Sequence, residues 1–485
     1  MGIVTSQSFK NTVSTYLGFG IGALNTLFLY TYFISDVYYG LVAFILSTAN
    51  IVMPIMAFGA HNTIIKFYSS FKTKNSLNSF LTLMLLLPLT LSIPIGLIGC
   101  FTYEAIGELL SQKNEIVKGY VWYIFVSAIA MAYFEVFFAW SKTQLQTVFG
   151  NFMKEVFHRV GVMLLLFAVY FKWLDVEEFI AGVVIVYILR MLIMKLYAFT
   201  IRFPVIKFNR IEGLSAILKY SALIIIAGSI STIILDIDSF MLGMYIPIQE
   251  VAYYGVAIYI ATVIVVPSRS MQQILQPLTA QYLNDKNKVA LKDLYVRSSQ
   301  TLFIIGGFIF LVIIININTL YLLIPKEFSG GLVVVFLVGI AKLYDCLMGC
   351  NNVVLFNSDY YRVVLLFGVI LTVLTVFLNM LFIPMYGING SAFATFLAVL
   401  IYNSIKIYFV KRKFDMMPFN RDTTKVLVLI VLSALLFYFW EFPFHPIINI
   451  AFKTLLATVV YVLTILKLNV SEDISGVIKK YLRIK

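Results

Sequence analysis

The sequence predicts an all-α polytopic membrane protein with about 14 transmembrane helices, arranged as two pseudo-symmetric six-helix lobes and two carboxy-terminal helices. Composition, a series of long apolar segments and an internal repeat predict this class. Hydrophobic residues make up 61% of the 485 residues and charged residues only 12%, about half the share in globular proteins. The mean hydropathy of +0.94 leaves too little polar surface for a large water-exposed domain.

The predicted spans are apolar segments of roughly 18–25 residues bounded by charged or turn residues. They are expected at 12–33, 39–60, 79–101, 119–140, 157–174, 179–201, 219–246, 253–280, 297–320, 331–356, 362–383, 389–410, 424–440 and 447–467. The first segment has no small-residue cleavage site after a short apolar core, so we expect it to be retained as a helix. The connections, the longest of which include 61–78 and 102–118, are too short to fold as separate domains.

The distribution of basic residues predicts the orientation. If both termini are cytoplasmic, most of the 36 Lys and Arg residues fall on the cytoplasmic side. The outer connections then contain only Lys113, Lys118, Lys172 and Lys326. This asymmetry follows the positive-inside rule. It explains the net charge of +13 without nucleic acid, whose binding needs basic residues interleaved with aromatics on a soluble face.

A short motif occurs twice, six helices apart. Residues 34–40, Ile-Ser-Asp-Val-Tyr-Tyr-Gly, close the turn after the first helix, and residues 248–255, Ile-Gln-Glu-Val-Ala-Tyr-Tyr-Gly, do the same after the seventh. Each copy precedes an apolar helix with a proline, Pro54 or Pro267, and a weaker copy at 383–387 precedes the twelfth helix. A repeated six-helix unit in parallel orientation is typical of transporters whose lobes rock about a central cavity.

These turns, with the Gly18–Gly22 segment of the first helix, resemble those of the multidrug/oligosaccharidyl-lipid/polysaccharide (MOP) exporter superfamily, and within it the O-antigen-type flippases of the polysaccharide-transport branch. In such a protein the lobes would be 1–212 (helices 1–6) and 213–423 (helices 7–12), and 424–485 would be helices 13 and 14 and a cytoplasmic tail. The resemblance implies that the protein moves an undecaprenyl-pyrophosphate-linked oligosaccharide across the bacterial inner membrane by alternating access, for surface polysaccharide biosynthesis. A polysaccharide polymerase and glycosyltransferases of the same pathway are the implied partners.

Charged residues inside the spans are candidates for the site, because an ionised side chain at the bilayer centre costs about 2.5–3.5 kcal/mol on insertion scales. A forked guanidinium can hold anionic oxygens; the alternative for Arg190 and Arg269 is an arginine that snorkels to the interface. Lys342 and Asp345, three residues apart, are expected to neutralise one another or to form a polar stripe with Asn351. The candidate substrate-binding residues are Arg269, Arg190, Lys342, Gln272, Gln273 and Asn351.

Four acidic residues are candidates for ion coupling, with H+ or Na+ as the coupling ion: Asp236, Asp238, Glu135 and Asp345. A carboxylate in a span can load and release an ion when its access changes between the two faces. Asp236 and Asp238 are two residues apart and point in nearly opposite directions, so both cannot face one wall. Because three basic residues stand against these four acids, an anionic ligand requires local segregation of positive charge. The Cys and His residues have no metal-binding spacing, so no metal site or cofactor is expected.

Two other function classes stay open. One is a cation-coupled drug or metabolite antiporter of the same superfamily, for which twelve helices and a mainly acidic cavity would be expected. The other is a membrane glycosyltransferase or polymerase, which would need a long outer loop with catalytic acids. The longest outer connection carries only Glu104, Glu108 and Glu115. We therefore expect a transporter and not an enzyme.

Overall fold

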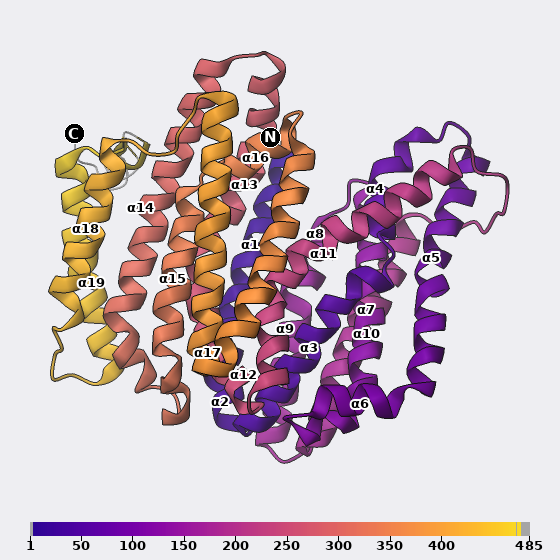
Figure 1. Ribbon diagram of the computed structural model, residues 1–485, viewed down its shortest axis with the longest axis horizontal. Helices are drawn as coiled ribbons and strands as arrows, with labels where there is room; N and C mark the ends of the chain where they lie inside the picture. The colour runs from indigo at the N-terminus through magenta and orange to yellow at the C-terminus, as the bar shows by residue number, and fades with distance from the viewer. Residues whose placement is uncertain (1–2, 472, 477–485) are drawn as a thin grey trace. The chain divides into compact units, whose positions relative to one another are not determined.

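The computed structural model describes residues 3–471 and 473–476, and the regular structure in them is helical throughout (Figure 1). Within these residues, ten helical segments are long and apolar enough to cross a membrane. The chain is therefore a multi-pass, all-α membrane protein, as the sequence predicts. Its contacts divide it into two compact units, Met1–Gly255 (unit 1) and Val256–Lys485 (unit 2). The predicted lobes are defined by the sequence repeat and stay a prediction.

Unit 1 is built around α7, which packs against α3, α4 and α10 (Figure 1). Its main elements are α1 (Ile3–Leu24), the π-helical turn η1 (Asn25–Leu29), α2 (Tyr30–Phe33), α3 (Asp36–Met56), α4 (Ala60–Phe67), α5 (Lys74–Phe101), α6 (Tyr103–Ser111), α7 (Val121–Lys142), α8 (Val148–Phe152), the π-helical turn η4 (Met153–Phe157), α9 (His158–Tyr170), α10 (Val176–Ile201) and α11 (Leu214–Tyr245). Fully buried aromatic side chains of α7, Phe134 and Trp140, lie in its core.

Unit 2 is built around α14, which packs against α13, α15, α18 and α19. The helix α12 (Gln249–Thr262) leads into it. Its main elements are α13 (Val266–Asn284), α14 (Lys288–Tyr321), α15 (Leu332–Leu347), α16 (Asn351–Asn357), α17 (Tyr361–Phe414), α18 (Arg421–Tyr438) and α19 (Pro446–Leu468). In Figure 1 the yellow pair α18 and α19 lies beside α14.

Local sequence sets the helix limits. The side chains of Asp175 and Asn420 accept hydrogen bonds from backbone N–H groups in the first turns of α10 and α18, so each forms a capping box. Within α17, Gly387 has φ 57° and ψ −133°, which breaks the helix. This break lies in the weaker motif copy at 383–387, between the predicted helices 362–383 and 389–410.

All the predicted spans coincide with helices, but the predicted connections contain further helices. The short helices α4 and α6 occupy much of the connections 61–78 and 102–118. They were missed because their apolar residues cover only one face and are too few for a span.

Candidate functional site

A group of charged side chains gathers inside unit 1, and we call it the charged cluster. It comprises Glu135 and Lys142 of α7, Lys154 and Glu155 of η4, Arg159 of α9 and Arg190 of α10. The charges of Glu135 and Glu155 both act on Arg190. The structure thus brings together two residues that the sequence singled out, Arg190 and Glu135.

Arg190 is buried rather than extended to an interface, with 8% of its surface exposed. Its guanidinium carbon lies 4.3 Å from the ring centre of Phe134 and 4.8 Å from that of Tyr187. Aromatic rings stabilise the positive charge of Arg190, but they accept few hydrogen bonds from its guanidinium N–H groups. Within the described part of the chain, its buried Nε has no hydrogen-bond partner. The described residues thus leave this donor without an acceptor.

Both acidic residues of the cluster are already paired. Lys154 donates to Glu135 at 2.6 Å, and Arg159 lies 3.4 Å from the carboxylate of Glu155. Lys142 instead lies over the ring of Phe138, with its Nζ 3.9 Å from the ring centre. Four basic side chains thus stand against two paired acids, which leaves a local excess of positive charge.

The cluster depends on close packing between α1 and η4. A Cβ atom on Gly18 would lie 2.4 Å from the carbonyl oxygen of Glu155 and 2.6 Å from Nη1 of Arg159. Asn25, in η1, donates to the carbonyl oxygen of Arg159 at 2.8 Å. The glycine therefore lets α1 approach η4 closely, as small residues do at helix contacts in membranes. Both π-helical turns lie in this region, and such turns are frequent at functional sites.

Two histidines adjoin the charged cluster. The ring of His158 packs 5.7 Å from that of Tyr187. His61 lies in α4, outside the spans; burial lowers its pKa, and the nearby Glu135 opposes this effect. The direction of this shift favours the neutral form of His61.

A second polar group lies inside unit 2, and we call it the unit 2 polar cluster. Asn403 donates to Asp345 at 2.8 Å, and Lys406 donates to Asn352 at 2.9 Å. Lys406 is 1% exposed, and its charge interacts with that of Asp345. No ion pair joins Lys342 to Asp345 in the part of the chain that the structure describes. The structure differs here from the predicted neutralisation of Lys342 by Asp345. The Asp345 carboxylate accepts a hydrogen bond from Asn403 of α17 instead of pairing with Lys342 on its own helix.

The remaining candidates of unit 2 have varied surroundings. Asn351 is fully buried and donates to the hydroxyl of Tyr295 at 2.7 Å. Arg269 and Gln272 of α13 are exposed, and Lys342 is half-buried. The side chain of Gln273 lies outside the described residues. Their roles in substrate binding stay predictions.

The two aspartates of α11 have different partners. Asp238 is buried and accepts a hydrogen bond from the hydroxyl of Tyr254 at 2.6 Å. Asp236 is hydrogen-bonded to Asn50 of α3. Their opposite directions on the helix place them against different neighbours, so any ion they bind would be bound separately.

The two motif copies meet within unit 1, and we call this the motif contact. Tyr253 of the second copy donates a hydrogen bond to Asp36 of the first. A Cβ atom on Gly40 would lie 2.0 Å from the carbonyl oxygen of Ile248. The side chain of Asn114 accepts from the backbone N–H of Ile248 at 2.7 Å and donates to two carbonyl oxygens at the end of α11.

Several of these residues were missed by sequence reasoning. Lys154, His158 and Arg159 lie at the edge of the predicted connection 141–156. Lys154 and His158 are four residues apart and share one helical face, and Arg159 follows directly; this grouping of basic residues beside a span is the signal that could have found them. Nothing in the sequence singles out Asn114, because a polar residue in a short connection is ordinary.

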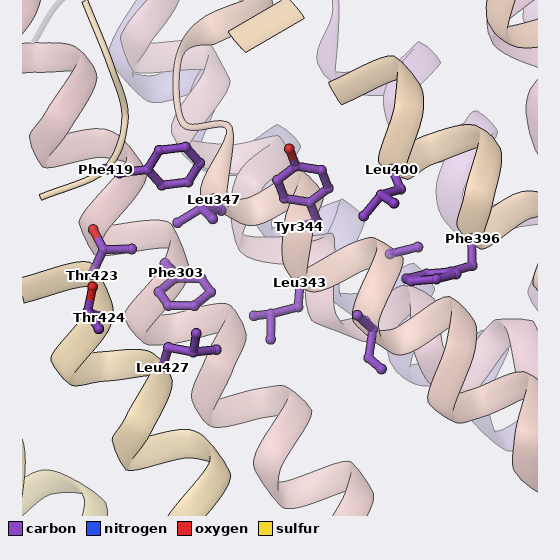
Figure 2. Close-up of a pocket in the computed structure, with 12 residues that line it drawn as sticks. Phe303, Leu343, Tyr344, Leu347, Phe396, Leu400, Phe419, Thr423, Thr424 and Leu427 are labelled. Carbon is purple, nitrogen blue, oxygen red and sulfur yellow. The ribbon is translucent and has the colours of Figure 1, made fainter. Parts of the chain in front are cut away.

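An apolar cavity of about 390 Å3 lies within unit 2. Figure 2 shows Phe303 of α14, Leu343 and Tyr344 of α15 and Leu427 of α18 around it. Its polar groups come from Tyr344 and two threonines at the start of α18. The Tyr344 hydroxyl lies 3.1 Å from the hydroxyl of Ser404. The cavity is therefore suited to an apolar chain, with few polar groups.

The helical fold, with charged side chains buried in its spans, defines the class as a polytopic membrane protein. The chain belongs to the polysaccharide biosynthesis protein family, whose model matches residues 4–283. It is similar in fold to the lipid II flippase MurJ in an inward closed conformation, with 14% identity and a TM-score of 0.75 over 93% of this chain and 97% of that one.

It is also similar in fold to a multidrug resistance MATE family transporter of the MOP superfamily. The inward-facing form gives 13% identity and a TM-score of 0.59 over 86% of this chain and 95% of that one. The outward-facing form gives 14% identity and a TM-score of 0.54 over 85% of this chain and 96% of that one. No curated protein gave a significant match. The family match and the shared fold both agree with the resemblance to the MOP superfamily seen in the sequence.

Proposed function

We propose that the protein is a flippase that translocates an undecaprenyl-pyrophosphate-linked oligosaccharide across the bacterial inner membrane by alternating access, for surface polysaccharide biosynthesis. Membership of the polysaccharide biosynthesis family and the fold shared with the lipid II flippase support a lipid-linked substrate. In this proposal both termini are cytoplasmic, because that orientation places most basic residues inside. A polymerase and glycosyltransferases would act before and after transport.

One observation carries the proposal: Arg190 is buried with an unpaired donor, in a cluster whose acids are already paired. A pyrophosphate presents several charged acceptor oxygens to such a fork. A drug cation would need a free carboxylate there, and Glu135 is held by Lys154. The charged cluster therefore favours an anionic headgroup.

The lipid carrier requires a separate apolar environment. The cavity shown in Figure 2 has walls of Leu, Ile and Phe side chains and could hold part of an isoprenoid chain. A chain that moves there from the bilayer leaves an equally apolar environment, so packing against these side chains would decide its binding. Alternating access also requires contacts that break and re-form. In this proposal, the motif contact is one of the interactions that break when the substrate cavity opens to the other face of the membrane.

The second candidate function is a cation-coupled drug or metabolite antiporter. The fold shared with the MATE transporters supports it. For either function, Asp236, Asp238, Glu135 and Asp345 are the candidates for coupling to H+ or Na+. The antiporter would need one of these carboxylates to exchange its present partner for a cation.

The test is flipping of a fluorescent undecaprenyl-pyrophosphate-linked sugar in proteoliposomes, measured by its accessibility to a quencher that does not cross the membrane. Arg190→Gln should lower the rate at least about tenfold, as expected for the loss of a charge-assisted contact of about 1.5–3 kcal/mol. Arg190→Lys should keep part of the rate. Lys195→Gln, on the same helix, is the matched control and should flip normally.

Wild-type flipping by Arg190→Gln would refute the role of the charged cluster. If the wild-type protein moved no lipid-linked sugar but exchanged a drug cation against H+ or Na+, the antiporter would replace the flippase.

A further inference from the structure

Four basic side chains converge at one end of unit 2, and they play no part in the proposed function. Lys288 and Lys292 come from the first turns of α14, and Arg412 and Lys413 from the last turn of α17. Together they line a hollow of about 740 Å3, which we call the basic hollow. The hollow joins helix ends that lie far apart in the sequence.

The charges of the basic hollow are poorly balanced. It contains two acidic residues, Asp293 and Asp415. Asp293 is already engaged by Arg297, whose Nε lies 3.0 Å from its carboxylate. Across residues 3–471 and 473–476, none of the four basic side chains forms an ion pair. Four cations thus face one unengaged carboxylate, and an anion would relieve their mutual repulsion.

The position of the hollow indicates where that anion comes from. Both helices belong to candidate spans, Lys288–Tyr321 and Arg362–Phe414, and the basic residues lie at the ends of these spans. Lys292, Arg412 and Lys413 lie within about five residues of the apolar segments predicted at 297–320 and 389–410, about 8 Å along a helix, which is the level of the lipid headgroups. Val289, between the two lysines, is 81% exposed, which suits contact with lipid better than contact with water. A membrane lipid therefore fits the hollow better than a soluble anion.

We propose that the basic hollow binds the phosphate-bearing headgroup of an anionic membrane phospholipid. The two lysines are four residues apart and share one face of α14, and Arg412 offers a forked donor for phosphate oxygens. The lipid bridges the start of α14 and the end of α17, so it stabilises unit 2 by binding its folded state. This lipid is a resident ligand and not the molecule that is transported.

The experiment uses the purified full chain in nanodiscs of phosphatidylcholine with increasing phosphatidylglycerol. The midpoint of thermal unfolding reports lipid binding. The apparent affinity for phosphatidylglycerol should fall about 25-fold in Lys288→Gln/Lys292→Gln, at about fivefold for each basic residue removed. Arg412→Gln/Lys413→Gln, at the other helix end, should fall similarly, and each variant should melt like the wild type in pure phosphatidylcholine.

The matched control is Lys72→Gln/Lys74→Gln, which removes two exposed basic residues of unit 1. It should lower the apparent affinity much less than the two hollow variants do, because neither lysine lines the basic hollow. An equal loss in this control would show that lipid responds to total charge, and the proposal would fall. Unchanged affinity in both hollow variants would also overturn it. Addition of inorganic phosphate should not raise the unfolding midpoint; an increase equal to that given by phosphatidylglycerol would replace the lipid with a soluble anion.

Discussion

Gly40 and Gly255 end the two Tyr-Tyr-Gly sequences, and the structure predicts opposite effects when each is replaced by alanine. A Cβ atom on Gly40 would lie 2.0 Å from the backbone carbonyl oxygen of Ile248, and the equivalent atom on Gly255 meets nothing within 4 Å. Both glycines lie inside helices, α3 and α12. Alanine should therefore gain about 1 kcal/mol of helix propensity at either position.

The steric contact between a Cβ atom at Gly40 and the carbonyl oxygen of Ile248 makes the stabilities of the two variants differ. A carbonyl oxygen cannot rotate away as a side chain can, so Gly40→Ala must move α3 or the start of α12. Overpacking of this kind costs about 1–3 kcal/mol, and a backbone neighbour favours the upper end. After the gain in helix propensity, Gly40→Ala should destabilise by about 2 kcal/mol, whereas Gly255→Ala should stabilise by about 1 kcal/mol.

The assay is thermal unfolding of both variants in the same detergent, with hydrogen exchange of the α12 backbone as a local measure. Gly40→Ala should lower the melting temperature and speed exchange at the start of α12, because the hydrogen bond from Tyr253 to Asp36 depends on the same approach. Tyr253→Phe separates that hydrogen bond from the steric effect. Equal melting of the two alanine variants would refute the reasoning.

Other substitutions test the packing of the polar groups. Gly18→Ala should displace Arg159 and lower flipping of the lipid-linked sugar, while Gly20→Ala, which has open space around its Cβ position, should not. Asn114→Ala should lower the free energy of unfolding by about 3 kcal/mol, because it leaves buried backbone groups without partners; chemical denaturation measures this. Asp345→Asn should destabilise by about 1 kcal/mol, because the hydrogen bond from Asn403 loses its charged acceptor. The same denaturation assay measures this loss.

The helical architecture was predictable because it depends on local properties. Apolar length, capping residues and turn glycines act within a few residues, so Asn420 and Gly387 mark helix limits that sequence reasoning can find. The contact between the two motif copies was not predictable in the same way. Its partners, Asp36 and Tyr253, are far apart in the chain, and only the folded structure brings them together.

The choice of partner for a charge was the least predictable feature. Spacing suggested that Asp345 pairs with Lys342, because residues three apart share a helical face. In the structure the side chain of Asp345 is held by Asn403 of α17. A residue on another helix can approach a charged side chain from any direction. A single sequence therefore does not show whether that residue or a neighbour on the same helix becomes the partner of the charge.

The same argument explains why the balance of charges in the spans is a poor guide to the ligand. In the sequence, the four acidic candidates inside the predicted spans outnumber the three basic ones, and this count argues against an anionic ligand. In unit 1, however, Glu135 and Glu155 are paired with Lys154 and Arg159, two bases at the edge of a predicted connection. The pairing leaves Arg190 with a buried, unpaired donor. We expect a ligand to respond to the charge that remains after local pairing, and in this cluster that charge is positive.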